Sequence, residues 1–460
     1  MNLTGAHGLR RERLSPAERA ASPARLDEGE RFPPHVTWTI LLCTLPMFGQ
    51  CFHYYNELPP TYLLSKAWPI LTLPLTIYTI AQVKLPAKGI YLIFLAYALG
   101  LTPLISIIHL GNDFIGSIAT TVKIWPITYY FGLFAMLLWL APTDTRTRAA
   151  CITLGYSTYG IMLMLWLVIP PSWYNDDSAL GKLLLNEQER GNRIYMPMFF
   201  GILLLFYLVR SFMQKPQVWK VAAVIVGFIL MLWIYKQRTA IAAALLICGY
   251  GIVASSPDRI RRLFIAVGCV LAPIAAVAFF LSAGNVTESL GNSLSVRQNS
   301  LNIAIEFLGD NPLSWLFGVG ATTRFGTVTL SDIFQDRSFF IADLGWAGEI
   351  FEYGLVGALL IFILHAWGFF AVHAAARRSR DPFAQALGDY ILYLFATSAV
   401  YPLVFTPGEV GVVMAVGVYL DRYRKKRLEA PPQGPHLSLR TARKRVTVAI
   451  PRAVRVTRSG

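Results

Sequence analysis

The sequence is poor in charged residues, cysteine and histidine. Only 15% of its 460 residues are charged and 55% are hydrophobic, and the chain has five cysteines and seven histidines. Uncharged apolar runs of bilayer length recur along it. This composition excludes an ordinary soluble domain and predicts an all-α polytopic membrane protein.

Motifs of several catalytic classes are also missing. There is no Walker loop, no CxxC pair and no HExxH, which argues against an ATP-driven pump or a zinc hydrolase. The cysteines lie in apolar runs without metal-ligand spacing, so we interpret them as small buried hydrophobes. Asp176-Asp177 could hold a metal, but an adjacent acidic pair in a polar loop is usually just solvated. We therefore expect neither a metal nor a cofactor.

Composition divides the chain into three segments. Residues 1–35 form a polar leader without the apolar core of a signal peptide, and we expect it to be disordered, retained and cytoplasmic. Residues 36–420 form the membrane domain. The tail, 421–460, carries twelve Lys and Arg against two acidic residues. A basic tail directly after a span indicates contact with anionic membrane lipid in the cytoplasm, and we expect no nucleic-acid partner.

The apolar runs predict about twelve transmembrane helices, two of them within 383–420. Basic residues fall in alternate gaps, which assigns these gaps and both termini to the cytoplasm. They lie at Lys84 and Lys88, at Arg146 and Arg148, at Lys215 and Lys220, at Arg259, Arg261 and Arg262, and at Arg377, Arg378 and Arg380. The other gaps face outward, including long segments at about 171–193 and 282–345, the second partly helical. Function is expected in these outward loops, where irregular backbone meets water.

One gap departs from this orientation rule. Lys236 and Arg238, in "YKQRT", carry positive charge but face outward in this alternation. The run from 217 to 234 spans about 27 Å as a helix, which places Arg238 at the outer surface. The two charges are explained equally well by a snorkelling interfacial pair or by a functional site.

More arginines belong to the outward segments. They are Arg190 and Arg193 before a span, and Arg297, Arg324 and Arg337 in the large loop. Several guanidiniums converging on one pocket suit a diphosphate, because each donates paired hydrogen bonds to phosphate oxygens and stays charged. Taken alone, Arg190 and Arg193 are interpreted more simply as solvated charges near Glu187 and Glu189.

The large loop contains a predicted amphipathic helix in "SVRQNSLNIAIEFLGDNP". Ser295 and Gln298 match a capping box, and Asn311-Pro312 ends the run. Arg297 then falls in the first turn, where it and the free backbone N–H groups would hold an anion. Gly318-Val319-Gly320 is interpreted as a tight turn with a weak potential as an amide nest for phosphate.

Four elements in a fixed order carry a family resemblance over roughly residues 185–365. They are "ERGNRIYMPMFFG", "YKQRTAIAAALL", "SVRQNSLNIAIEFLGDNPLSWLFGVG" and "DLGWAGEIFEYGLVGALL". Together with the many-span layout they resemble the O-antigen polymerase and O-antigen ligase superfamily of bacterial polysaccharide enzymes. The resemblance implies a metal-independent, inverting glycosyltransferase in the bacterial inner membrane, with a periplasmic active site and an undecaprenyl-diphosphate-linked donor.

The resemblance also implies residue roles. Arg190, Arg238 and Arg297 match the family arginines that bind the donor diphosphate and neutralise the charge developing on the leaving group. The expected catalytic residues are Arg238, Arg297 and Asp343, and the expected substrate-binding residues are Arg190, Arg193, Lys236, Arg324, Arg337 and Glu352.

Asp343 decides between branches of this family. Ligases carry a His about nine residues before the Glu of "E-x-G-L-x-G", and the corresponding position, counted back from Glu352, is Asp343. This favours a polymerase that transfers a growing lipid-linked glycan onto the next lipid-linked repeat unit. Asp343 would orient or deprotonate the acceptor hydroxyl, or simply cap a helix that begins near Gly345. Glu349 and Glu352 are expected to face protein or water.

Two alternative functions stay open. A ligase would move finished glycan to lipid A core or protein by the same chemistry, whereas a lipid-linked oligosaccharide flippase would need arginines along spans in both halves of the membrane. The expected partners are the lipid-diphosphate-linked donor and acceptor, membrane lipids, and a chain-length regulator and flippase of the same pathway. The product would be O-antigen, capsule or exopolysaccharide.

Overall fold

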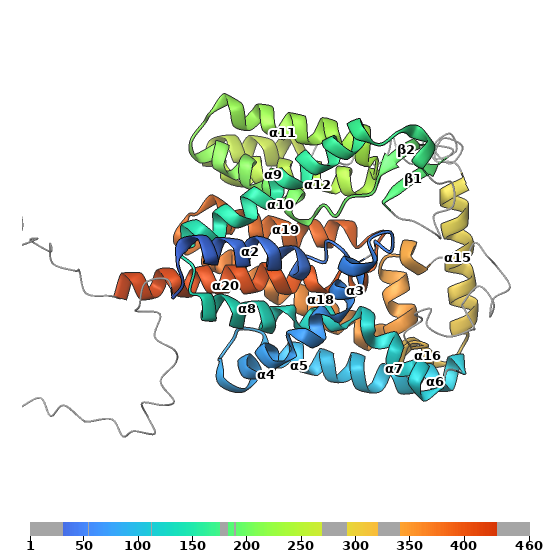
Figure 1. The fold of residues 1–460 in the computed structure, drawn as a ribbon. Helices are drawn as coiled ribbons and strands as arrows, with labels where there is room; N and C mark the ends of the chain where they lie inside the picture. Colours follow the sequence, from blue (N-terminus) through green and yellow to red (C-terminus); the bar gives the residue numbers. More distant parts are fainter. Residues whose placement is uncertain are drawn as a thin grey trace, which may run out of the picture.

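A computed structural model describes residues 31–53, 55–111, 113–174, 183–187, 190–268, 292–320 and 341–429. These residues are overwhelmingly helical, which confirms the predicted all-α class, and they add one two-stranded antiparallel hairpin that was not predicted (Figure 1). Most helices run side by side in one bundle, and α15 (Asn292–Leu308) stands crosswise at one end of it.

The first half of the bundle contains short helices that begin at prolines. Its elements are α2 (Pro34–Phe48), α3 (Pro59–Leu71), α4 (Leu73–Gln82), α5 (Lys88–Ala96), η1 (Tyr97–Leu101), α6 (Thr102–Leu110), α7 (Phe114–Thr120), η2 (Thr121–Lys123), η3 (Trp125–Thr128), α8 (Tyr129–Leu140) and α9 (Asp144–Val168). Proline lies in the first turn of α2, α3, α4, α6 and η3, where its missing N–H leaves no helical bond unmade. The segments Phe114–Lys123 and Trp125–Leu140 meet at an angle of 53°.

The second half holds the hairpin and the longest helix. Its elements are η4 (Pro171–Trp173), β1 (Leu184–Glu187), β2 (Gly191–Ile194), α10 (Phe199–Gln214), α11 (Val218–Leu230), η5 (Met231–Tyr235), α12 (Arg238–Ser255), α15, α16 (Pro312–Phe317), η6 (Ile341–Asp343), α18 (Trp346–Ser379), α19 (Pro382–Thr397), η7 (Leu403–Phe405) and α20 (Pro407–Glu429). The strands pair in the register Leu184 to Ile194 and Glu187 to Gly191.

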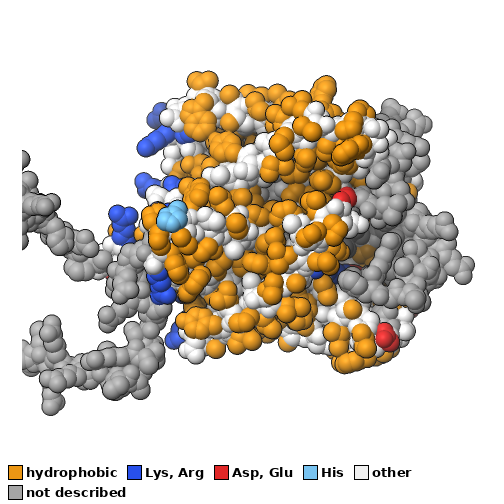
Figure 2. All heavy atoms as spheres, in the orientation of Figure 1, with side chains coloured by type: hydrophobic (Ala, Val, Ile, Leu, Met, Phe, Trp, Pro, Cys, Tyr) orange, Lys and Arg blue, Asp and Glu red, His pale blue; other side chains and the backbone are white. Residues whose placement is uncertain are grey.

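The core of the bundle is built from α8, α10, α19 and the first half of α20. Most side chains of these helices are buried, because a helix that is apolar around its whole circumference is stable in the middle of a bundle. The outer helices instead expose large apolar side chains, including Ile108, Leu167 and Leu246. Figure 2 shows these hydrophobic side chains covering the middle of the molecule, as expected of a surface that contacts lipid.

Six helices of the described residues are long and apolar enough to cross a membrane, or seven if the bent pair around Ile124 is one span. The chain is therefore consistent with a multi-pass membrane protein, and the figure of about twelve spans stays a prediction. The count differs because α2, α10 and α19 have only 15 or 16 residues each. The apolar run at 263–281 lies largely outside the described residues.

The bundle has two chemically different ends. Lys and Arg side chains gather at the end from which α20 projects, which we call the basic end (Figure 2). There Arg422 of α20 contacts the carbonyl oxygen of Lys84, and Gln214 donates to the carbonyl oxygen of Arg380 at 2.7 Å. The opposite end, which we call the hairpin end, carries β1, β2 and α15 (Figure 1). Most of the predicted site residues lie at the hairpin end.

Candidate functional site

The hairpin places two predicted arginines around one carboxylate. Arg193 lies on β2 and forms an ion pair with Glu187 of β1, while Nε of Arg190 in the turn lies 3.5 Å from the other Glu187 oxygen. Arg193 is only 8% exposed, and its Nε has no hydrogen-bond partner in the described part of the chain. Two guanidiniums therefore share a single carboxylate here, which leaves donor capacity for an anion.

Lys236 fastens this hairpin to the bundle. The π-helical turn η5 ends at Lys236, whose backbone adopts the left-handed conformation (φ 54°). Its ammonium donates to the carbonyl oxygens of Arg190 and Asn192, each at 2.8 Å. Burial and the nearby Arg193 lower the pKa of Lys236 below its ordinary value. Lys236, which was predicted to bind substrate, is thus hydrogen-bonded to backbone carbonyl oxygens. It holds in place the hairpin that carries Arg190 and Arg193.

Arg238 has a different environment from Lys236, two residues earlier. It opens α12 at the hairpin end and is exposed. Within the described residues, no hydrogen bond or ion pair connects its guanidinium to another side chain. An exposed arginine that has no partner among the described residues is available to a ligand.

Arg297 and Asp343 face each other from α15 and η6. The guanidinium lies 4.0 Å from the carboxylate, and their side chains are 30% and 42% exposed. Burial raises the pKa of Asp343 above its ordinary value, and the charges of Arg297 and Arg190 oppose that rise. Asp343 therefore lies within electrostatic reach of two arginines from separate segments, so the structure brings Arg190, Arg297 and Asp343 together.

Two details of the predicted loop helix are wrong. The helix begins at Asn292, so Ser295 lies inside it and cannot form the predicted capping box, and Arg297 falls in the second turn. Asp343 does not cap α18 either, because Gly345 is the capping residue and supplies no side chain. Arg297 is consequently not positioned to act together with the free N–H groups of a helix start. Any anion at Arg297 would therefore be bound by the guanidinium alone.

Arg324 and Arg337 lie outside the described residues, as does Asp176-Asp177. Their predicted roles therefore stay predictions.

Glu352 lies near two interruptions of helical structure, one at Gly354 within α18 and one at the bend before α8. Residue Gly354 interrupts α18 with non-helical angles (φ 63°, ψ −179°), and the backbone of 316–320 packs into the break. The amides of Val319 and Gly320 donate to the carbonyl oxygens of Phe351 and Glu352 at 2.9 and 3.1 Å. The suggested amide nest at Gly318-Val319-Gly320 is therefore wrong for these two amides, because both are bonded to α18.

The carboxylate of Glu352 is 1% exposed and pairs with Lys123 at 2.5 Å. Lys123 is the last residue of η2, at the bend before α8. Its ion pair with Glu352 therefore connects this bend to the interruption of α18. Glu349, one turn earlier, accepts a hydrogen bond from the amide of Val404 at 2.8 Å. Sequence reasoning missed Lys123, although a lone lysine in an apolar run is a recognised sign of a functional or paired charge.

A tyrosine-rich cluster lies between the hairpin and the start of α20. Tyr195 follows β2, its ring lies 5.9 Å from that of Tyr235, and the guanidinium carbon of Arg193 lies 5.9 Å from its centroid. The hydroxyl of Tyr390 donates to Glu409 at 2.8 Å. Sequence reasoning missed Glu409. The signal that could have found it is an acidic residue one turn into an apolar helix.

A separate hollow of about 780 Å³ lies between α15, α16 and α18. Its wall includes Leu316 and Leu355, with Glu306 and Asp310 as its acidic members. Ile305 of α15 also lines it and is 46% exposed. Among the described residues that line this hollow there is no arginine, so this wall is not suited to a diphosphate.

Within the described residues, no group of three or more His, Cys, Asp and Glu side chains could hold a metal ion. No protein-family model matches the chain, and no curated protein sequence is detectably similar to it. The functional argument therefore depends on the geometry of the hairpin end.

Proposed function

We propose that this chain is a bacterial polysaccharide polymerase of the inner membrane, with both termini in the cytoplasm and the hairpin end at the periplasmic face. It transfers a glycan from a lipid-diphosphate donor to the next lipid-linked repeat unit. The observation that carries the proposal is the gathering of Arg190, Arg193 and Arg297, from two distant segments, around only two described carboxylates. Arg238 adds a guanidinium at the same end that is exposed and unpaired within the described residues.

This charge distribution suits a diphosphate leaving group. In inverting transfer, an acceptor hydroxyl attacks the anomeric carbon, the bond to the diphosphate breaks, and negative charge grows on the departing oxygen. Arginines aimed at that charge stabilise the transition state, and removing one such donor typically lowers the rate about 10²–10³-fold. Lys236 holds the hairpin in position for this role, and Asp343 pairs with Arg297 until the diphosphate binds.

The flippase alternative has less support in this geometry. It needs arginines available along the spans in both halves of the bundle. Arg210, in the half toward the basic end, is already saturated by a bidentate pair with Asp389 at 2.6 Å and by Ser255 at 2.9 Å. An arginine bound in this way is structural.

The test uses purified protein and lipid-linked repeat units extracted from source cells that lack the gene, without nucleotide sugar. Products are resolved by mass spectrometry. Elongated lipid-linked chains support the polymerase, and transfer only to added lipid A core or protein indicates a ligase. Movement of intact lipid-linked saccharide across a vesicle membrane without new glycosidic bonds indicates a flippase and overturns the proposal. Arg259→Ala, a basic-end variant, is the matched control for Arg238→Ala.

A further inference from the structure

We propose that Glu409, and not Asp343, receives the proton of the acceptor hydroxyl. This inference rests on the proposed glycosyl transfer and assigns a catalytic carboxylate within it. In the step, the acceptor O–H proton passes to Glu409 while its oxygen forms a bond to the anomeric carbon. The anomeric carbon–oxygen bond to the diphosphate breaks, and the electron pair leaves with the diphosphate.

The position of Glu409 is fixed from two sides. It lies in the first turn of α20, and the preceding amide of Gly408 donates to Oε1 of Gln50 at 3.1 Å. The Tyr390 hydroxyl donates to one carboxylate oxygen at 2.8 Å. The α20 residues from Val410 to Leu420 are buried, whereas Glu409 itself is partly exposed. A positioned carboxylate that keeps an exposed part is able to meet a substrate hydroxyl.

Tyr195 and the segment 50–55 connect Glu409 to the arginines. The guanidinium of Arg193 lies against the Tyr195 ring. The segment 50–55 contacts both regions, because Gln50 accepts from the amide of Gly408 and the hydroxyl of Tyr55 donates to the carbonyl oxygen of Tyr195. Tyr195 is partly exposed, whereas Tyr235, on which it stacks, is buried, so Tyr195 alone offers an aromatic face to a ligand. Sugar rings pack on such surfaces through their apolar C–H faces. The order of guanidinium, aromatic ring and carboxylate thus follows the order of diphosphate, sugar and attacking hydroxyl in the transfer.

Asp343 is less suited to accept the proton. Its carboxylate faces Arg297 at 4.0 Å and lies within electrostatic reach of Arg190. This carboxylate is already engaged by the guanidinium of Arg297, which draws it toward the diphosphate-binding arginines and away from an acceptor hydroxyl. Asp343 therefore acts on the diphosphate-binding arginines, whereas Glu409 accepts a hydrogen bond from Tyr390 and forms no ion pair with a cation within the described residues.

The experiment separates diphosphate binding from chain elongation in Glu409→Gln and Asp343→Asn. Binding is measured with undecaprenyl diphosphate as the probe, and elongation with the extracted lipid-linked repeat units. We expect Glu409→Gln to bind the probe within twofold of the wild type and to elongate about 10²–10⁴-fold more slowly, the range of lost general-base catalysis. Asp343→Asn should change probe affinity and slow elongation by less than Glu409→Gln.

Glu409→Gln that elongates within threefold of the wild type would overturn the inference, as would Asp343→Asn with the larger loss and unchanged probe affinity. If Glu409→Gln does not give a single folded species by gel filtration, Glu409→Asp replaces it. That variant keeps the carboxylate but withdraws it by one methylene, and a loss below threefold again contradicts the inference. Asp258→Asn, at a 78% exposed carboxylate, is the control. Failure of the proposed function is distinct, because the wild type itself would then not elongate.

Discussion

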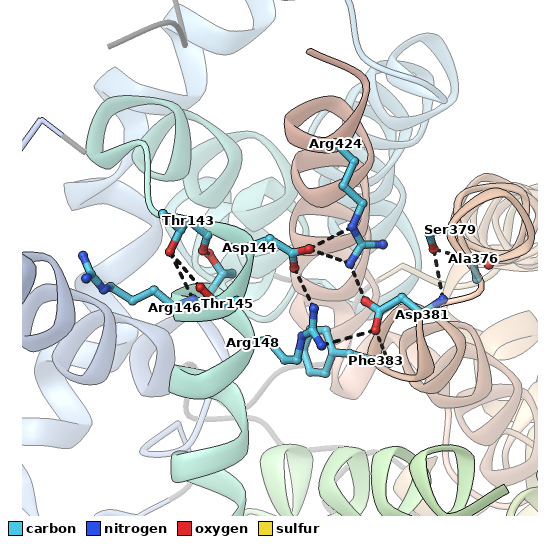
Figure 3. A network of polar contacts seen from close by, with 11 residues as sticks. Thr143, Asp144, Thr145, Arg146, Arg148, Ala376, Ser379, Asp381, Phe383 and Arg424 are labelled. Atoms are coloured by element: carbon cyan, nitrogen blue, oxygen red, sulfur yellow. Dashed lines mark hydrogen bonds and ion pairs between the residues drawn. The ribbon is translucent and has the colours of Figure 1, made fainter. Parts of the chain in front are cut away.

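The arginines at the two ends of the bundle differ in how many carboxylates are paired with them. At the basic end, Arg148 and Arg424 bind Asp144 and Asp381 in a closed network of two cations and two anions (Figure 3). At the hairpin end, Arg190 and Arg193 share Glu187. The difference indicates that the first set stabilises the fold, whereas the second retains capacity for an anionic ligand.

Two helix N-termini also stabilise the basic-end network. Asp144 lies in the first turn of α9, where Thr143 accepts a hydrogen bond from the amide of Arg146. Asp381 caps α19 by accepting from the amide of Phe383. Both carboxylates therefore lie at the positive ends of helix dipoles, and Arg424 of α20 joins these two ends (Figure 3). Each charge in the network has a local structural reason.

The largest effect is expected at Arg210 and Asp389, the buried pair whose charges are most completely hydrogen-bonded. Their side chains are 7% and 4% exposed. Arg210→Ala should lower the free energy of unfolding by about 3–5 kcal/mol, because it leaves Asp389 as a buried unpaired charge. The measurement is the yield and unfolding transition of purified protein in detergent. The double variant Arg210→Met with Asp389→Leu should recover most of the loss, and no recovery would show that the pair does more than neutralise itself.

A smaller loss, confined to activity, is expected at Arg238. Arg238→Ala should reduce elongation about 10²–10³-fold, because one donor to the leaving diphosphate is removed, while the unfolding transition stays unchanged. Arg238→Lys should retain part of the rate, since an ammonium keeps the charge but loses bidentate geometry. Arg259→Ala should alter neither property. An inactive Arg238→Ala protein that is also strongly destabilised would remove the contrast between the two ends.

A weaker, pH-dependent effect is expected at Asp343. Its pKa is raised above the ordinary 3.8, so the carboxylate is lost as the pH falls through that raised pKa. Protonation releases Arg297 and adds positive charge to the site, so diphosphate affinity should rise on acidification. An exposed ion pair is worth up to about 1 kcal/mol, or about fivefold in affinity.

The comparison protein for this pH effect is Asp343→Asn. It should bind the diphosphate up to about fivefold more tightly than the wild type at neutral pH, and the two affinities should converge as the pH falls. Protonation of the ligand is common to both proteins and cancels in their ratio. A ratio that stays constant with pH, measured by titration with inorganic pyrophosphate, would show that Asp343 does not compete for Arg297.

The sequence predicts the helical class and the separation of two groups of basic residues better than the contacts between distant segments. Charge and hydropathy are local, so they place Arg238 and Arg297 without a tertiary structure. The pair of Lys123 and Glu352 joins residues 229 positions apart, and it depends on the breaks at η2 and Gly354. No local pattern in "EYGLVGALL" requires a break there. The catalytic proposal for Glu409 likewise depends on Tyr195 from a distant segment.

The smallest effect is expected at Arg424 in the basic-end network. Its side chain is 22% exposed, and its partners are 18% and 8% exposed. Arg424→Ala should cost about 1 kcal/mol, because partly exposed pairs are screened by water, and Arg148 continues to neutralise both carboxylates. The loss should shrink in high salt, which screens these charges. It is measured as the difference in unfolding free energy from Arg427→Ala, an exposed arginine on the same helix.

Elongation by Arg424→Ala should match that of the wild type once both are normalised to folded protein. The network lies at the opposite end of the bundle from the hairpin, and all four charges in it already have partners (Figure 3). If this variant stays folded but loses elongation as Arg238→Ala does, then the number of carboxylates paired with an arginine would not distinguish structural from functional arginines. The basic end would then have to act on the hairpin end through α20, whose first turn carries Glu409.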